Sequence, residues 1–285
     1  MTDQRVAVTG ATGAVGGLVA RQLVAEGRGP LRLVVRHPER APELAGATVR
    51  QASYSDHAAA VAALTGTDVV LMVSASESAD RVQQHVTFIE AAAAAGVQHI
   101  VYTSFLGAAP RATFTLARDH WATEERIRSI GLAFTFLRDS LYLDDLPSFA
   151  GEDGVIRGPA GDGLVGAVAR ADIARVAAAV LTDPAAHAGA TYDLTGREAL
   201  TLADAARVIT EVTGAPTRYH EETLEEAFAS RAHYGAPDWE VAAWVSTYTA
   251  IAAGEMAAVT DDVRRITGRP ASTLAEHLAA SARTR

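Results

Sequence analysis

Residues 5–17 read RVAVTGATGAVGG, and this stretch decides the fold of the chain. A short apolar run ends in three glycines spaced GxxGxxG (Gly10, Gly13 and Gly16), and apolar residues at helical spacing follow. A strand, a tight turn and a helix in this order bind nucleotides. The first glycine permits the turn, the second lets the backbone approach a pyrophosphate, and the third lets the helix pack on the strand. The helix N-terminus then presents free N–H groups to the phosphates. A glycine-rich turn without a ligand is the alternative, which the flanking strand and helix make weak.

The next expected strand, residues 31–36, ends in an arginine. Sites that prefer NAD place an acidic residue there for the 2′-hydroxyl of the ribose, whereas Arg36 suits a 2′-phosphate through charge-assisted hydrogen bonds. Arg40 is a candidate second contact. The sequence therefore predicts NADP rather than NAD, and a solvated arginine at a strand end is the alternative.

Apolar runs and amphipathic segments alternate through the first half of the chain. The run at 68–74 (DVVLMVS) is apolar almost throughout, which is typical of a central parallel strand buried on both faces. The other expected strands are 48–52, 99–104 and 133–138, and the expected helices are 58–64 after the N-cap Asp56, 82–95 before Gly96, and 116–130 before Gly131. This alternation predicts an α/β fold with a doubly wound parallel sheet of the Rossmann type.

Ligands of such sheets bind at the carboxyl ends of the strands. Three stretches of small, polar or aromatic residues end strands there, at 74–76, at 103–105 and at 138–142. We therefore expect the dinucleotide to cross the sheet along these strand ends.

Beyond Tyr142 the pattern changes. Residues 144–162 are rich in Gly, Pro and acidic residues, which predicts a loop that can act as a flap. The remaining expected elements are a helix at 168–181, a strand at 191–194, and helices at 201–213 (N-cap Thr201), 241–258 and 261–266. We expect an NADP-binding Rossmann domain in 1–142, completed by 168–195, and a smaller, mostly helical lobe on the substrate side in 143–167 and 196–285.

Composition excludes several classes of function. A net charge of −9 argues against nucleic acids and anionic membranes as partners. The absence of cysteine excludes disulfides and Cys-ligated metals, and it suits a cytoplasmic location. The start at 2–5 is polar and no apolar run is long enough for a membrane span, so we expect neither a signal peptide nor a membrane segment. All 25 basic residues are arginine, so lysine-assisted acid–base chemistry is excluded.

Several motifs together resemble one family. They are VTGATGAVG at 8–16, Arg36 after the second strand, VYTSFLGA at 101–108, DHWATE at 119–124 and FLRDSLY at 136–142. The chain is similar to the atypical short-chain dehydrogenases/reductases, in the NmrA-like branch that contains type-2 NAD(P)H:quinone oxidoreductases and triphenylmethane reductases. The resemblance implies a Rossmann domain with a small C-terminal lobe, NADP(H) as cofactor, and reduction of quinones or similar electron-poor conjugated compounds.

The resemblance also implies roles for individual residues. The pyrophosphate loop corresponds to Gly10, Thr12, Gly13, Ala14, Val15 and Gly16, and the 2′-phosphate ligand to Arg36. Ser74, Ala75 and Ser76 correspond to the ribose segment, Thr103, Ser104 and Phe105 to the nicotinamide segment, and Phe105, Leu106 and Tyr142 to the substrate side. The family commonly has Asp before the tyrosine that follows the third strand. Here Ser53 precedes Tyr54, so the contacts to adenine are expected to be weaker or to come from the backbone alone.

Ordinary short-chain dehydrogenases use a Tyr-x-x-x-Lys pair, in which the tyrosine protonates a carbonyl. Leu116 and His120 occupy the two corresponding positions. An alkoxide formed from an unactivated ketone needs a matched proton donor, so such a substrate is disfavoured. A reduced quinone instead spreads its charge over a ring and can take protons from solvent, so positioning can supply most of the rate.

Two side chains are expected to act near the nicotinamide. His120 is predicted to hold a ribose hydroxyl or to relay a proton, with Glu124 orienting it, and a structural hydrogen-bonding role is the alternative. Ser104 is predicted to contact nicotinamide or substrate, and otherwise only caps its strand. The other histidines have no metal-binding spacing. Trp239, Trp244 and Tyr248 indicate core or a dimer surface, which leaves a homodimer open.

The first hypothesis is therefore an NADPH-dependent reductase of a small quinone-like acceptor. The second is an NmrA-like redox sensor that binds NADP(H) without turnover and acts through a protein partner. An isomerase or dehydratase of the extended short-chain class is a third, and the missing pair counts against it. The sequence does not identify the acceptor.

Overall fold

The glycine-rich stretch forms the strand–turn–helix unit that its sequence predicts. In the computed structural model, which describes residues 4–283, β1 (Val6–Thr9) leads into a turn at Gly10 with φ of 62° and then into α1 (Ala14–Ala25). Residues 2 and 3, on which part of the signal-peptide expectation rests, lie outside the described range.

Seven strands of the described chain form one sheet, with the order β3-β2-β1-β4-β5-β6-β8. The strands beside β1 are β2 (Leu31–Val35), β3 (Ala47–Gln51), β4 (Val69–Met72), β5 (His99–Phe105), β6 (Ala133–Asp139) and β8 (Thr191–Leu194). The first five strands pair in parallel, and β1 lies between β2 and β4, so the chain winds outward from β1 in both directions. This arrangement confirms the predicted doubly wound α/β fold.

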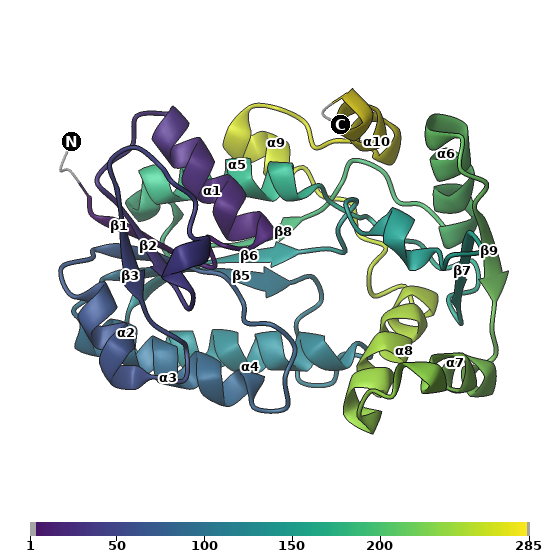
Figure 1. The fold of residues 1–285 in the computed structure, drawn as a ribbon, viewed down its shortest axis with the longest axis horizontal. Coiled ribbons are helices and arrows are strands. Elements are labelled where there is room, and N and C mark those ends of the chain that lie inside the picture. The colour runs from purple at the N-terminus through teal and green to yellow at the C-terminus, as the bar shows by residue number, and fades with distance from the viewer. Residues whose placement is uncertain (1–3, 284–285) are drawn as a thin grey trace. The chain divides into compact units, whose positions relative to one another are not determined.

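Helices cover both faces of this sheet. They are α1, α2 (His57–Leu64), α3 (Arg81–Ala94), α4 (Thr115–Ser129) and α5 (Arg170–Thr182). Figure 1 shows α1 and α5 on one face and α2, α3 and α4 on the other. The core between sheet and helices includes the fully buried rings of Phe88, Tyr102 and Phe136.

The predicted ends of α2, α3 and α4 are confirmed to within one residue. Asp56 accepts a hydrogen bond from Ala59 N–H (3.0 Å) and caps α2. Gly96 and Gly131 follow α3 and α4 with φ of 83° and 78°, a conformation that glycine adopts without strain.

The chain divides into two compact units. The first comprises residues up to Phe105 together with Asp119–Arg138 and Arg170–Tyr192. The second comprises Leu106–Arg118, Asp139–Ala169 and the chain from Asp193 onward. Residues 106–118, expected within the Rossmann domain, group with the second unit.

The second unit has more regular structure than the sequence predicted. Its elements are β7 (Val155–Gly158), α6 (Leu202–Thr213), β9 (Arg218–Glu221), α7 (Leu224–Arg231), α8 (Asp238–Ala252), α9 (Asp262–Thr267) and α10 (Leu274–Arg283). The expectation of a continuous loop at 144–162 is wrong, because β7 lies within it and pairs in parallel with β9. The expected helix at 241–258 ends earlier, at Ala252. The strand β9 and the helices α7 and α10 were not predicted.

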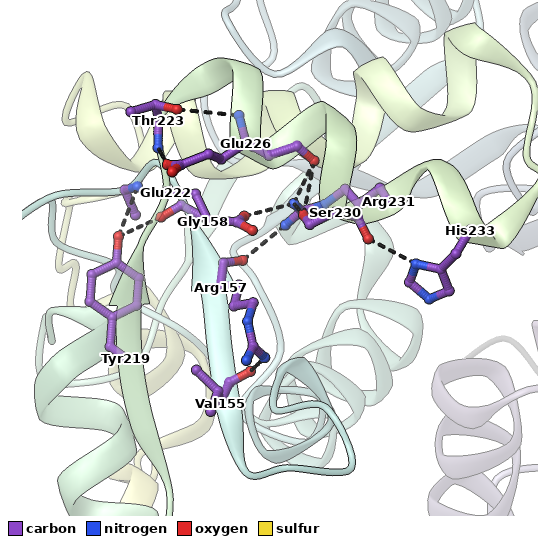
Figure 2. Close-up of polar contacts among 12 residues, drawn as sticks. Val155, Arg157, Gly158, Tyr219, Glu222, Thr223, Glu226, Ser230, Arg231 and His233 are labelled. Atoms are coloured by element: carbon purple, nitrogen blue, oxygen red, sulfur yellow. Dashed lines mark hydrogen bonds and ion pairs between the residues drawn. The ribbon is translucent and has the colours of Figure 1, made fainter.

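A buried arginine joins β7 and β9 to α7 (Figure 2). The side chain of Arg231 donates to Glu222 Oε2 (3.0 Å) and to the carbonyl oxygen of Arg157 (2.9 Å). Tyr219 OH donates to the carbonyl oxygen of Gly158 (2.6 Å), which ties the two strands together. Among residues 4–283, no helix has the length and apolar character required to cross a membrane.

Candidate functional site

The glycine loop forms a cradle that leaves no room for a side chain at Gly16. Gly13 N–H donates to Gly10 O (2.8 Å), and an added Cβ at Gly16 would lie 2.5 Å from two backbone oxygens, Gly10 O and Thr9 O. No side chain of the described residues caps α1, so the N–H groups of its first turn have no side-chain acceptor there. Thr12, Gly13 and Ala14 are exposed, whereas Val15 and Gly16 are buried. Exposed backbone at an uncapped helix N-terminus fits a pyrophosphate.

Arg36 directly follows β2 and is exposed. Within residues 4–283 its guanidinium makes no hydrogen bond or ion pair, and only its carbonyl oxygen is bonded, by the Gln51 side chain (3.1 Å). A guanidinium that binds no side chain of its own protein suits the 2′-phosphate of NADP. The residues present therefore fit the dinucleotide.

The segment that follows β4 is held by side chains. Three successive backbone N–H groups, those of residues 73–75, each donate to a side chain. The pairs are Val73 to Thr9 Oγ1 (2.9 Å), Ser74 to Thr103 Oγ1 (2.9 Å) and Ala75 to His85 Nε2 (2.9 Å). Tyr54 OH donates to Val73 O (2.6 Å), so this tyrosine supports the segment. A Cβ at Gly10 would lie 3.1 Å from Val73 Cβ, so the segment directly adjoins the glycine loop.

Both backbone polar groups of Ala75, its N–H and its carbonyl oxygen, form hydrogen bonds with side chains of α3. Its N–H donates to His85 Nε2 and its carbonyl oxygen accepts from Arg81 Nε (2.9 Å). His85 Nδ1 in turn lies 2.8 Å from Thr123 Oγ1, whose hydroxyl donates to Asp119 O (2.7 Å). Burial, together with the charge of Arg81, lowers the pKa of His85 to about 3, so its imidazole is neutral at physiological pH.

His120 lies at the centre of a second set of contacts. Arg81 Nη2 is 3.0 Å from His120 Nε2, and Tyr102 OH is 2.9 Å from His120 Nδ1. Because a guanidinium only donates, Nε2 accepts and the proton of the imidazole is on Nδ1. Burial, together with the charge of Arg81, lowers the pKa of His120 well below its usual value. His120 is 5% exposed and both its ring nitrogens are bonded, which favours the structural alternative over proton relay.

Ser104 belongs to a separate buried cluster. Its hydroxyl donates to Glu124 Oε1 (2.6 Å), and Arg138 binds the same carboxylate through Nε (2.8 Å) and Nη2 (2.7 Å). Arg128 adds a third cationic contact (3.1 Å). The expectation that Glu124 orients His120 is wrong, because in the described chain its carboxylate binds Ser104 and the two arginines instead. The cluster fixes the carboxyl end of β5.

Phe105, the last residue of β5, is half-buried, and its ring centroid lies 6.0 Å from that of His120. The other two expected substrate-side residues, Leu106 and Tyr142, are in the second unit. Leu106 is buried and its N–H donates to Asp139 O (2.9 Å). Tyr142 OH donates to Asp139 Oδ2 (3.2 Å), and burial raises the pKa of the Asp139 carboxyl well above its usual range. Asp139 therefore favours its neutral form.

Sequence reasoning missed Arg81, His85, Arg138 and Asp139. Arg81 and His85 lie four residues apart on the helix that follows the 74–76 segment, so they share a helix face. That spacing was the available signal. Arg138 and Asp139 lie inside the FLRDSLY motif but carried no separate prediction.

Comparisons with known proteins agree with this geometry. Residues 10–184 match the protein family described as NAD(P)H-binding. Quinone oxidoreductase 2 of Escherichia coli (strain K12) is 35% identical over 277 residues, which cover 95% of this chain and 96% of that protein. NAD(P)H azoreductase of Xenophilus azovorans is 33% identical over 282 residues, covering 97% and 98%.

Solved structures show the same similarity. The E. coli quinone oxidoreductase 2 structure in complex with NADPH has a TM-score of 0.87 and covers 97% of this chain and 99% of its own. Triphenylmethane reductase of Citrobacter sp. has a TM-score of 0.85 at 31% identity, covering 99% and 100%. Both similarities extend over nearly the whole chain.

Proposed function

Because this chain belongs to the NAD(P)H-binding family and is an NAD(P)H-dependent oxidoreductase, we propose that it transfers hydride from NADPH to a quinone or a similar conjugated, electron-poor acceptor. The named relatives include reductases of quinones and azo compounds, which share a conjugated system that can hold two added electrons. The small-molecule acceptor itself is part of this proposal.

The proposed cofactor site lies on the first unit. The Gly10–Gly16 cradle and the α1 N-terminus bind the pyrophosphate, and Arg36 binds the 2′-phosphate and so favours NADPH over NADH. The strand-end residues 74–76 and 103–105 line the ribose and nicotinamide portions. When bound, NADPH supplies the hydride.

The residues of the chain position the reactants more than they move protons. The Ser104–Glu124–Arg138 cluster fixes the end of β5, and with it the position of Phe105, against which we place the acceptor. Tyr142, in the second unit, corresponds to a substrate-side position by the resemblance alone. A quinone that accepts hydride becomes a delocalised monoanion and takes its proton from water, so no side chain needs to act as an acid.

One observation carries this proposal: His120, which by the resemblance corresponds to the usual lysine, is buried and has both ring nitrogens bonded. His120 Nε2 accepts from Arg81, and its pKa lies well below the ordinary value, so His120 supplies neither a charge nor an acid. We propose that His120 supports the site through Arg81. An acceptor that needs no protein-bound acid matches such a site.

The experiment mixes purified protein and NADPH with a panel of quinones, azo compounds and simple ketones, and follows the absorbance of the reduced nicotinamide. We expect oxidation of NADPH with at least one quinone or azo compound and none with simple ketones. If NADPH binds but no acceptor oxidises it, the reductase proposal is wrong, and the non-catalytic sensor becomes the better account.

A further inference from the structure

The segment between β4 and α3 is fixed by α3 itself. Ala75 offers one donor and one acceptor, and both are satisfied by side chains one helical turn apart, His85 and Arg81. His85 is fully buried and Arg81 is 5% exposed. A buried arginine and a buried histidine are costly to desolvate, so their retention at one peptide indicates a constraint on its position.

We propose that Arg81 and His85 are positioning residues that hold Ser74–Ser76 in the conformation that binds the cofactor, before the cofactor arrives. The inference rests on the proposed NADPH site, because it assigns to this segment a share of the affinity for NADPH. It assigns neither residue a contact with the reacting atoms.

The hydrogen atoms of the His85 contacts can be assigned without ambiguity. Ala75 N–H is a donor, so His85 Nε2 accepts and the proton of the ring is on Nδ1. Nδ1–H then donates to Thr123 Oγ1, whose own hydroxyl hydrogen goes to Asp119 O. Each donor in this series of hydrogen bonds, which runs from Ala75 to Asp119, has an acceptor. The imidazole of His85 therefore fits here in one tautomer only.

Arg81 connects the same segment to α4 by a second route. Its Nε donates to Ala75 O and its Nη2 to His120 Nε2, while Nη1 lies 3.7 Å from Asp119 Oδ2. His120 Nδ1–H donates in turn to Tyr102 OH on β5. The guanidinium is planar, so fixing two of its nitrogens fixes the third. The Ser74–Ser76 segment is therefore held to α3, α4 and β5 rather than being free to adjust.

The chain contains a matched control, His99. It is also a buried histidine, at 4% exposure, with its Nε2 2.9 Å from a threonine hydroxyl, that of Thr135. Burial lowers its pKa to about 4, close to the value of about 3 for His85. His99 begins β5 and pairs with the start of β4, whereas Ala75, which His85 binds, follows the end of β4. The two histidines therefore bind groups at opposite ends of these parallel strands. Replacing either one disturbs the core, but only His85 touches the Ser74–Ser76 segment.

The test compares three variants of the full chain: His85→Phe, His85→Gln and His99→Phe. Phenylalanine keeps the ring volume and removes the acceptor, whereas the glutamine amide oxygen can still accept from Ala75 N–H. For each variant the melting temperature, the Kd for NADPH by titration calorimetry, and kcat at saturating NADPH are measured. Loss of one buried hydrogen bond predicts that His85→Phe raises the Kd for NADPH about tenfold.

We expect His99→Phe to lower the melting temperature comparably and to leave the Kd for NADPH near the wild-type value. His85→Gln should recover most of the affinity, and kcat at saturating NADPH should change little in all three variants. An unchanged Kd in His85→Phe, or an equal rise in His85→Phe and His99→Phe, would overturn the inference. Wild-type protein that binds no NADPH would instead overturn the proposed function.

A measurement on the wild-type protein does not depend on the folding of any variant. Hydrogen–deuterium exchange of the peptide that spans residues 73–76 is followed without and with NADPH. The inference predicts slow exchange of the three N–H groups in both states, because their acceptors are already in place. Fast exchange that becomes slow only after NADPH is added would show that the segment is not held beforehand, and would contradict the inference.

Discussion

Two neighbouring regions of the first unit are held in different ways, the Gly10–Gly16 loop and the Val73–Ala75 segment. In the loop, backbone packs against backbone, and a Cβ at Gly16 would lie 2.5 Å from two carbonyl oxygens. In the segment, every N–H donates to a side chain from another element. The loop therefore has no room for a carbon atom at Gly16, whereas the segment depends on acceptors supplied by other elements. The two regions should fail under different changes.

The largest effect is expected from adding one carbon atom to the loop. Gly16→Ala should destabilise the protein by about 3 kcal/mol and abolish measurable NADPH binding, because backbone must move to admit the methyl group. Denaturant unfolding and calorimetry measure the two effects. Gly27→Ala is the control: its φ is 69° with open space around it, so it should cost about 1 kcal/mol and leave NADPH binding intact. An affinity for NADPH equal to that of the wild type in Gly16→Ala would contradict the assignment of the Gly10–Gly16 loop as the pyrophosphate site.

The next effect concerns the choice of cofactor. Arg36→Asp should weaken NADPH binding by about 100-fold, because it replaces a charge-assisted contact with repulsion, and should change NADH binding far less. Arg28→Asp makes the same change of charge at another exposed arginine and should leave the preference unaltered. Equal losses for the two cofactors in Arg36→Asp would remove the argument for a 2′-phosphate.

A smaller effect concerns how pH changes the stability that each region contributes. The pKa of His85 in the folded protein, about 3, is below its unfolded value, so the stability that His85 confers is complete above pH 6.5 and declines as the pH falls toward 3. The stability lost by His85→Phe should therefore shrink with falling pH, at most by about 1.4 kcal/mol per unit. The loop holds no titratable group, so the effect of Gly16→Ala should be constant. Urea unfolding at about pH 7, 6 and 5 measures both effects at intervals of about one pH unit. A constant difference for His85→Phe would contradict its neutral, buried state.

The smallest effect is expected at His120. Because burial holds its pKa well below 6.5, kcat should show no ionisation of this group between about pH 6 and 8. His120→Asn should lower kcat by less than about tenfold, the scale of a lost positioning contact rather than of a lost acid. A wild-type pH profile with a group near 6.5 that disappears in His120→Asn would restore the proton-relay hypothesis.

The loop was predictable from sequence and so was the place of the segment, but the side chains that hold the segment were not, because the determinants of the two regions lie at different distances along the chain. The glycine pattern is local: three residues within seven positions specify a turn, a strand and a helix. The supports of the segment come from Thr9, Tyr54, Thr103, Arg81 and His85, which are 6 to 64 residues away from the positions they hold. Apart from the helical spacing of Arg81 and His85, no local pattern indicates such contacts.

The same distinction applies to the fold. Strand β4 is buried on both faces and was recognisable as a nearly continuous apolar run. Strand β7 was missed because its pairing partner, β9, is about 60 residues away and both strands are short. His120 was singled out on α4 as a ribose-binding or proton-relaying residue, with a structural role as the alternative. Its partners are Arg81 and Tyr102 and not Glu124, which periodicity alone does not distinguish.

The central claim is hydride transfer to an acceptor that needs no acid from the protein, and one measurement addresses it directly. NADPH carrying deuterium at C4 is mixed with the protein and a quinone in a single anaerobic turnover, in water and in deuterium oxide. The account predicts that oxidation of NADPH is slower with the C4 deuterium and changes little in deuterium oxide. A rate that falls mainly in deuterium oxide, or no oxidation of bound NADPH at all, would contradict it.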